Sequence, residues 1–231
     1  MAIAIKTIPK IIRHIWFGKD LKDPFDNPFY LKCATSNKQF LEGYEQTTWN
    51  KQQCYDFVKE HFPQYYDVYC KLSKDIMRID IIRYMMLHVL GGIYMDHDIT
   101  LNKGFDEHLG MSHFFVMEKI MTEELCIRVG LRNPIRNKVK EDQRRISNYC
   151  MGSIPGEQIW LDILKEIFNR IEVNPKCITL PKLLSQYDIL YLTGPDAVSH
   201  VVNRSEGSIV LSLPDSKSLL THHEAGTWRR D

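Results

Sequence analysis

Long hydrophobic runs are missing from this sequence. No stretch reaches the roughly 18 uninterrupted apolar residues that a membrane-spanning helix requires. The apolar start, "MAIAIKTIPKIIRHIW", is interrupted by basic residues and a proline, unlike the unbroken apolar centre of a secretory signal. We therefore expect no transmembrane segment and a cytoplasmic protein.

Charge of one sign is not in excess either. The 30 lysines and arginines are nearly balanced by 29 aspartates and glutamates, which leaves a formal net charge of +1. Proteins that bind nucleic acids through their phosphates present a strongly basic face. Nucleic acid is therefore not an expected partner.

Closely spaced cysteines are also absent. The six cysteines lie far apart and form no C-x-x-C motif, which favours reduced, buried thiols, with disulfides as the open alternative. A chain of 231 residues can bury a sizeable core and does not need such cross-links. Because no internal repeat or low-complexity region is present, we expect a single domain over residues 1–231.

Apolar periodicity and turn-forming residues divide the chain into short helices and strands. Helices are predicted at 50–60 with Asn50 as N-cap, at 74–90 with Gly91 and Gly92 as the stop, and at 156–171. Strands are predicted at 8–18, 44–49, 93–101, 113–118 and 125–129, and a polar, solvated excursion at 132–145. Helices that alternate with short strands favour an α/β sandwich.

The stretch "GGIYMDHDIT", residues 91–100, ends an apolar run in two carboxylates with one residue between them. In a strand, positions i and i+2 point to one face, so Asp96 and Asp98 should face one way with His97 turned aside. Two adjacent carboxylates repel each other, and a divalent cation between them removes that cost. Hard oxygen ligands suit Mg²⁺ or Mn²⁺.

The place of this pair adds to the signal. An Asp-x-Asp alone is common on exposed loops, but here it follows a buried element. In open α/β sheets, ligands bind outside the carboxyl ends of the strands. Since Mg²⁺ and Mn²⁺ also bind phosphate oxygens, the pair is a candidate platform for a nucleotide diphosphate.

The preceding helix carries a second charged pair. Asp80 and Arg83 are three residues apart and share a helix face. A surface ion pair is one interpretation. Their apolar surroundings equally allow a pair that points into a cleft, where Arg83 would bind a phosphate and Asp80 would accept hydrogen bonds from sugar hydroxyls.

These residues resemble a known family. The run "KDIMRIDIIRYMMLHVLGGIYMDHDI" resembles the DXD-containing sugar-binding region of glycosyltransferase family 32, which includes yeast-type initiating mannosyltransferases and capsular polysaccharide glycosyltransferases, and which is related to the clostridial glucosylating toxins. The matching positions are Asp80, Arg83, Tyr84, Gly91, Gly92, Tyr94, Asp96 and Asp98. Similarity extends to "IPKIIRHIWFG", "GYEQTTWN", "ISNYCMGSIPGEQIW", "YLTGPDAV" and "HHEAGTW", although only the 74–101 block is specific.

The resemblance implies a fold and an activity. The fold would be a GT-A type nucleotide-binding α/β sandwich with a mixed central sheet. The activity would be metal-dependent transfer of a sugar, with retention, from a UDP- or GDP-linked donor to a glycan or other hydroxyl acceptor.

The resemblance also implies roles for individual residues. Asp98 would ligate Mn²⁺ or Mg²⁺ directly, and Asp96 would bind the ribose or a metal-bound water. Asp80 and Arg83 would hold the donor sugar. The other donor-binding residues would be Ile15, Trp16, Tyr94, Asn148 and Trp228, the third metal ligand His223 (with His222 as the open alternative), and the acceptor-side residues Asp188 and Asp196.

Two other functions use similar residues. A metal-dependent phosphohydrolase would usually need further acidic ligands for a second metal, and none lies near Asp96 and Asp98 in sequence. A non-catalytic nucleotide-sugar binding module would not need both charged pairs intact. Position 227 is Thr where the family usually has Ser before the Trp.

Overall fold

A computed structural model describes residues 6–18, 22–125, 144–179 and 184–226. The predicted donor-binding residue Trp228 and most of the predicted strand at 125–129 lie outside these residues. The five cysteines within them are unpaired thiols, and four are buried.

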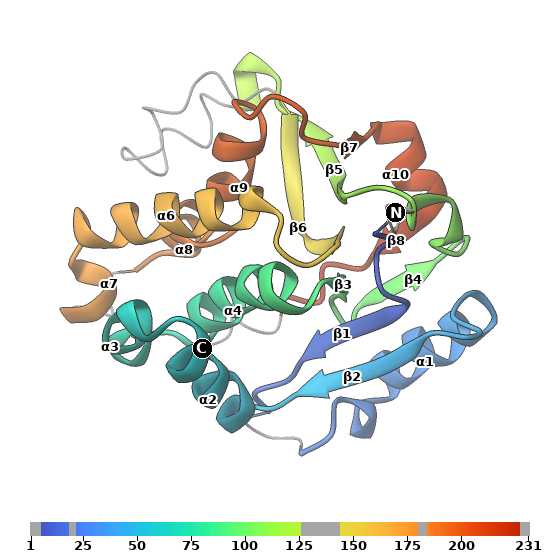
Figure 1. The fold of residues 1–231 in the computed structure, drawn as a ribbon, viewed down its shortest axis with the longest axis horizontal. Helices are drawn as coiled ribbons and strands as arrows, with labels where there is room; N and C mark the ends of the chain where they lie inside the picture. The colour runs from blue at the N-terminus through green and yellow to red at the C-terminus, as the bar shows by residue number, and fades with distance from the viewer. Residues whose placement is uncertain (1–5, 19–21, 126–143, 180–183, 227–231) are drawn as a thin grey trace, which may run out of the picture.

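The centre of the molecule is a six-stranded mixed sheet in the order β2-β1-β3-β6-β5-β7 (Figure 1). Strands β2, β1 and β3 are parallel, β6 runs antiparallel to both β3 and β5, and β7 is parallel to β5. The strands are β1 (Ile11–Ile15), β2 (Glu45–Trp49), β3 (Gly92–Met95), β5 (His113–Ile120), β6 (Arg144–Ser153) and β7 (Val210–Leu211). The predicted α/β sandwich with a mixed sheet is confirmed.

Helices and a small second sheet cover the two faces of the central sheet. Strand alternation sends Tyr94 into one core, and its neighbours Ile93 and Met95 into the other. The helices are α1 (Pro28–Asn37), α2 (Lys51–His61), α3 (Pro63–Lys71), α4 (Asp75–Leu90), α6 (Gln158–Glu172), α7 (Lys176–Thr179), α8 (Gln186–Leu192), α9 (Pro195–Val202) and α10 (Leu213–Leu219), with short 3₁₀ turns at Pro24–Asp26, Lys38–Phe40 and Asp106–His108. That residues 1–231 form one domain remains a prediction.

The predicted strand at 93–101 is interrupted. Strand β3 ends at Met95, residues 97 and 98 form a turn, and the chain continues as β4 (Ile99–Leu101). The break follows a change of partner, because β3 pairs with β1 and β6, whereas β4 pairs with β8 (Leu220–His222) near the C-terminus. Asp96 and Asp98 therefore lie at the end of β3, rather than along one continuous strand.

Two glycines connect α4 to β3 through a crowded passage. Gly91 has φ of +62° and Gly92 has φ of +91°, backbone angles that residues with a side chain rarely adopt. A Cβ at Gly91 would lie 2.8 Å from the carbonyl oxygen of Ser153, and one at Gly92 would lie 2.8 Å from that of Ile11. This pair therefore allows β3 to enter between β1 and β6 directly after the helix.

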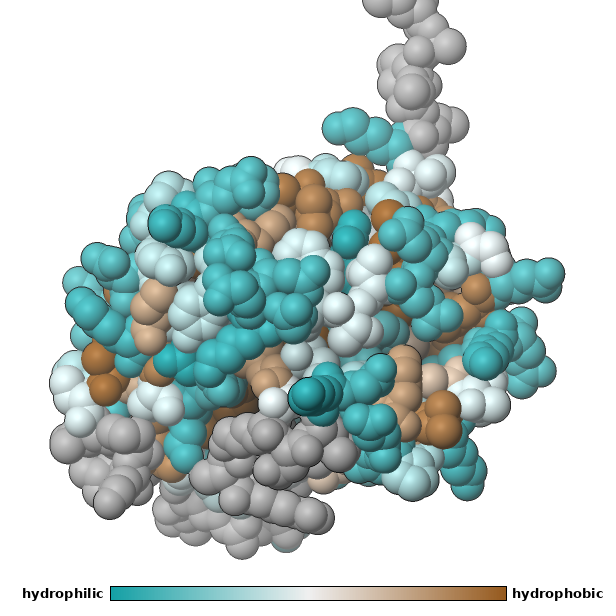
Figure 2. All heavy atoms as spheres, turned by 90° about the horizontal axis from the view of Figure 1, so that it is seen from below, coloured by the Kyte–Doolittle hydropathy of each residue, from teal (hydrophilic) through white to brown (hydrophobic). Residues whose placement is uncertain are grey.

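The surface is mixed in character. On the face drawn in Figure 2, brown side chains occur in small groups among teal ones rather than as one broad apolar patch. Among the described residues, no helix combines the length and the hydropathy that crossing a bilayer requires.

Gly91→Ala is expected to destabilise the protein by about 1–3 kcal/mol more than Gly43→Ala, because it adds overpacking to the cost of positive φ. Gly43 has φ of +76° but nothing within 4 Å of its Cβ position, so it controls for the backbone alone. Urea denaturation measures both free energies of unfolding. Equal losses for the two variants would contradict the crowded passage.

Candidate functional site

A cavity of about 540 Å³ opens where β1 and β3 end. It is large enough for a ligand of cofactor size. Three groups of residues line it: an aromatic group around Trp16, a charged network around Arg83, and a group that contains both aspartates of the Asp-x-Asp motif. The motif was predicted to lie at the carboxyl end of the sheet strands, and the cavity lies at that place.

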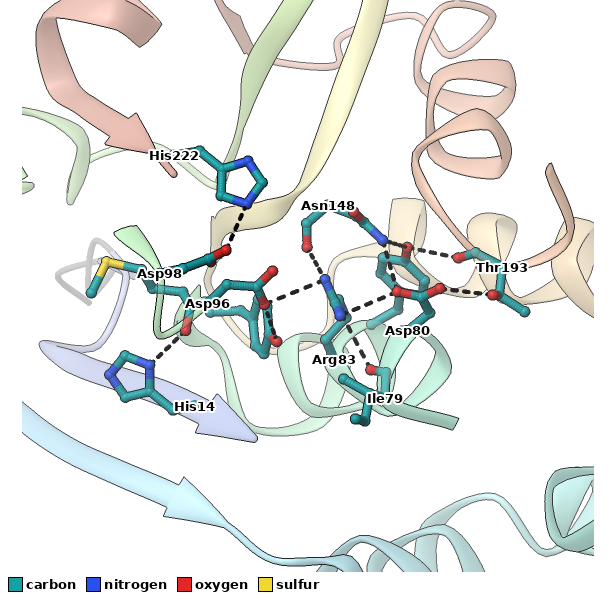
Figure 3. A network of polar contacts seen from close by, with 12 residues as sticks. His14, Ile79, Asp80, Arg83, Asp96, Asp98, Asn148, Thr193 and His222 are labelled. Carbon is teal, nitrogen blue, oxygen red and sulfur yellow. Dashed lines mark hydrogen bonds and ion pairs between the residues drawn. The ribbon is translucent and has the colours of Figure 1, made fainter. Parts of the chain in front are cut away.

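Asp96, Asp98 and His222 converge in this cavity. One ligand atom from each lies within 4.8 Å of the other two. The Nε2 of His222 is 3.4 Å from Asp98 Oδ2 (Figure 3). Strand pairing creates the group, since His222 in β8 is the register partner of Ile99, which directly follows Asp98.

The predicted third ligand, His223, is not in this group. His222 is the last residue of β8 and faces Asp98, whereas His223 lies just beyond the strand. His223 instead lies 3.0 Å from Thr100 Oγ1 and edge-on to Phe29. The structure therefore favours His222, the alternative that the sequence left open.

The electrostatics differ within the group. Burial raises the pKa of Asp96, against the opposing effect of Arg83. Burial would raise the pKa of Asp98, but His222 and the backbone N–H of Ala225 lower it below its usual range. Burial lowers the pKa of His222, and Asp98 reverses this into a net rise. Two carboxylate oxygens and one imidazole nitrogen are a donor set that fits a divalent metal, which would replace the proton of His222.

Arg83 connects this group to helix α4. Its side chain is almost fully buried and lies 3.6 Å from Asp96 and 3.1 Å from Asp80. It also donates to the backbone carbonyls of Ile79 and Asn148 and stacks over Tyr94, 4.6 Å from the ring centre. The sequence predicted contact with the donor, and the structure adds a role in joining three elements.

Asp80 is likewise engaged by protein groups. Asn148 donates to its Oδ1 at 2.9 Å, and Thr193 donates to its Oδ2 at 2.7 Å (Figure 3). Burial raises the pKa of Asp80 to about 6, against the opposing effect of Arg83. Thr193 was not among the predicted site residues, although it belongs to the "YLTGPDAV" segment that carries the resemblance.

Aromatic rings surround His97, the middle residue of the Asp-x-Asp motif. Trp16 lies edge-on to Tyr30 and to His97, with ring centres 5.5 Å and 5.8 Å apart. His97 stacks on the buried His14 at 4.5 Å. His97 lines the same cavity but does not belong to the group of Asp96, Asp98 and His222.

Tyr94 and Ile15 complete the predicted donor residues within the described part of the chain. The Tyr94 hydroxyl donates to Asp96 Oδ1 at 2.5 Å, which fixes that carboxylate. Ile15 lines the cavity beside Trp16.

The two predicted acceptor-side residues, Asp188 and Asp196, have different partners. Asp196 forms an ion pair with Arg145 at 2.8 Å, and Arg145 also binds Glu118 at 3.1 Å. Asp188 instead forms the capping box of α8 with Ser185. Neither aspartate lines the cavity, although Asp196 is paired with Arg145, which does.

Thr193→Val removes the hydroxyl that Asp80 Oδ2 accepts from, and we expect a loss of about 1–3 kcal/mol in the free energy of unfolding. Thr47→Val is the matched control, because the Thr47 hydroxyl makes only a long, 3.5 Å contact with Ile12 O, and its loss should stay within about 0.5 kcal/mol. Chemical denaturation of both variants checks this, and similar losses would refute it.

Comparisons with known proteins find similarity to glycosyltransferases. The model of the family described as "Glycosyltransferase sugar-binding region containing DXD motif" matches residues 27–115. An uncharacterized glycosyltransferase of Acanthamoeba polyphaga mimivirus is 27% identical over 71% of this chain and 57% of its own. A mannosyl phosphorylinositol ceramide synthase of Saccharomyces cerevisiae is 27% identical over 69% of this chain and 35% of its own. An initiation-specific alpha-1,6-mannosyltransferase of Candida albicans is 26% identical over 90% and 55%.

The chain thus spans only about a third to just over half of the length of these relatives. Among solved structures, the PaToxG glycosyltransferase is similar over 86% of this chain and 70% of its own, with a TM-score of 0.53 and 16% identity. This similarity confirms the GT-A type fold. The resemblance that the Asp-x-Asp block carries is confirmed as well, since residues 27–115 match this DXD-containing sugar-binding region and the relatives are named as glycosyltransferases or mannosyltransferases.

Proposed function

We propose that this protein is a metal-dependent glycosyltransferase that moves a sugar from a UDP- or GDP-sugar to a hydroxyl of a glycan or other acceptor, with retention at the anomeric carbon. The observation that carries the proposal is the convergence of Asp96, Asp98 and His222 in a cavity with an aromatic end. Retention rests on the family resemblance alone. The cytoplasmic location likewise remains a prediction.

Asp98 and His222 would hold the metal directly, with Asp96 as the third ligand or through a water. A bound divalent cation supplies positive charge that stabilises the departing diphosphate. Because one of the three ligands is an imidazole, Mn²⁺ fits better than Mg²⁺, which prefers oxygen ligands and waters.

The rest of the cavity offers a surface for the donor. Trp16 is half-buried and presents a flat apolar plane on which a nucleobase can stack. The network of Asp80, Arg83 and Asn148 lies on the other side of Asp96, where the donor sugar would sit. Since most of its polar atoms already have partners, this network would present a fixed set of groups to the sugar.

A phosphohydrolase with two metals is the less favoured candidate. Within residues 6–18, 22–125, 144–179 and 184–226, Asp96, Asp98 and His222 are the only grouping of metal-ligating side chains. A two-metal hydrolase needs a second set of ligands roughly 3.5–4 Å from the first metal.

The test is isothermal titration calorimetry of UDP and GDP with and without Mn²⁺, followed by product analysis with UDP- and GDP-sugars. A glycosyltransferase should bind one diphosphate more tightly with Mn²⁺ and should release that diphosphate from the donor. Release of inorganic phosphate would favour the phosphohydrolase. Binding without release across many acceptors would favour a binding module.

His222→Ala should weaken Mn²⁺ binding by at least about tenfold, because even partners outside the ligand shell contribute that much to metal affinity. His223→Ala, one residue away and directed to Thr100, should leave Mn²⁺ affinity within about twofold of wild type. Titration of Mn²⁺ in the presence of the preferred diphosphate measures both. The reverse order would move the third ligand to His223.

A further inference from the structure

Six carboxylates line the cavity, at Asp75, Asp80, Asp96, Asp98, Glu118 and Glu224. Asp75 is paired with Arg78 and Lys51, and Asp80 is held by Arg83. Asp96 and Asp98 belong to the candidate metal group. The remaining two are Glu118, which belongs to β5, and Glu224, which follows β8.

Glu118 is also committed to partners. Its carboxylate binds Arg145 at 3.1 Å and Lys119 at 3.1 Å. For Glu224, by contrast, the described part of the chain supplies no hydrogen bond and no ion pair to the carboxylate. Among the described residues, and apart from the candidate metal group, Glu224 is thus the lining carboxylate that no hydrogen bond or ion pair occupies.

The backbone holds Glu224 in a costly conformation. It has φ of +50°, and among the described residues no other non-glycine has a positive φ. Such a conformation costs about 1–3 kcal/mol, and it persists only where the surroundings enforce it. Two hydrogen bonds to Asp98 do so here: His223 N–H donates to its carbonyl at 3.0 Å, and Ala225 N–H to its Oδ2 at 2.9 Å. Glycine would avoid the cost, so the exposed side chain of Glu224 is a candidate for a role in the site.

Glu224 lines the same cavity as the candidate metal group and is close to it in the chain. It follows His222 by two residues, and the His222 ring stacks on Tyr149 at 4.1 Å. Burial raises the pKa of the Tyr149 phenol, and the charges of Glu118 and Glu224 add to this rise. The charge of Glu224 also raises the pKa of Arg145. Tyr149 and Arg145 both belong to β6 and form the wall at this end.

We infer that Glu224 is an acceptor-binding residue that accepts hydrogen bonds from a vicinal diol of a sugar or cyclitol ring. This inference rests on the proposed function. A carboxylate has two oxygens at a spacing that two neighbouring hydroxyls can reach together, and charge-assisted hydrogen bonds are the strong ones. Because the turn is tied to Asp98, an acceptor held by Glu224 is also held at a fixed position beside the donor.

Three variants test this. Glu224→Gln removes the charge at nearly constant size, Glu224→Gly removes the side chain while relieving the positive φ, and Glu224→Asp keeps a carboxylate. Glu42→Gln, at an exposed position away from the cavity, is the matched control. Release of nucleoside diphosphate from the preferred nucleotide sugar with Mn²⁺ is followed with methyl α-mannopyranoside, myo-inositol or, as a compound without a diol, 1-propanol.

In the wild type, the two polyols should raise diphosphate release above the rate in water, and 1-propanol should not. Glu224→Gln and Glu224→Gly should raise the KM for the polyol by about tenfold or more. Both should leave the Kd of the diphosphate with Mn²⁺ unchanged. Glu224→Asp should lie between wild type and Gln, and Glu42→Gln should behave as wild type.

Unchanged KM values in both variants would overturn the inference, as would a loss of diphosphate affinity equal to the loss of transfer. Equal release with and without polyols in the wild type would also overturn it, because no diol would then be recognised. Failure of the proposed function is a separate result, in which the wild type releases no diphosphate from any nucleotide sugar.

Discussion

The arrangement of the site depends on one buried cation, Arg83. Removing a single partner from a buried ion pair typically costs about 3–5 kcal/mol, since the remaining charge is left without compensation. Arg83 avoids this cost by contacting Asp80 on its own helix, Asp96 at the end of β3, and the Asn148 carbonyl on β6. These contacts are satisfied together only when α4, β3 and β6 meet at one place. The first aspartate of the motif is therefore oriented by the packing of the sheet against its main helix.

Much of this could be predicted from local sequence. The helix at 74–90 was predicted nearly to its observed bounds, because two glycines end it, although it is buried on nearly all sides between Met77 and Leu87 rather than along one apolar stripe. The N-cap of α2 at Asn50 was also predicted from neighbouring residues, and the structure adds the reciprocal hydrogen bond with Gln53. The metal role of Asp96 and Asp98 remains a prediction, but their convergence on one cavity follows from signals within the block 91–98.

The features that were missed depend on pairing between distant segments. The first residues of strand β6 fall in a stretch that looked like a solvated, basic excursion, since Arg144 and Arg145 find their partners in Asn203, Glu118 and Asp196, far away in sequence. The choice between His222 and His223 depends on the register of β8 against β4, and a shift of one residue would exchange them. The residue pattern of a single segment cannot reveal that register, because the register depends on pairing with a distant strand.

The same register explains why the last described residues matter to the site. Asp98 and Ala225 are 127 residues apart, yet the Ala225 N–H donates to Asp98 Oδ2, the oxygen that also faces His222. Hydrogen bonds of this kind hold a carboxylate in one orientation before a ligand arrives, so less order has to be imposed on binding. They also hold the turn at Glu224 in a conformation that this residue would otherwise rarely adopt. Because the Asp98 side chain contacts both His222 and the turn at Glu224, the geometry of the candidate metal group and the geometry of that turn cannot vary independently.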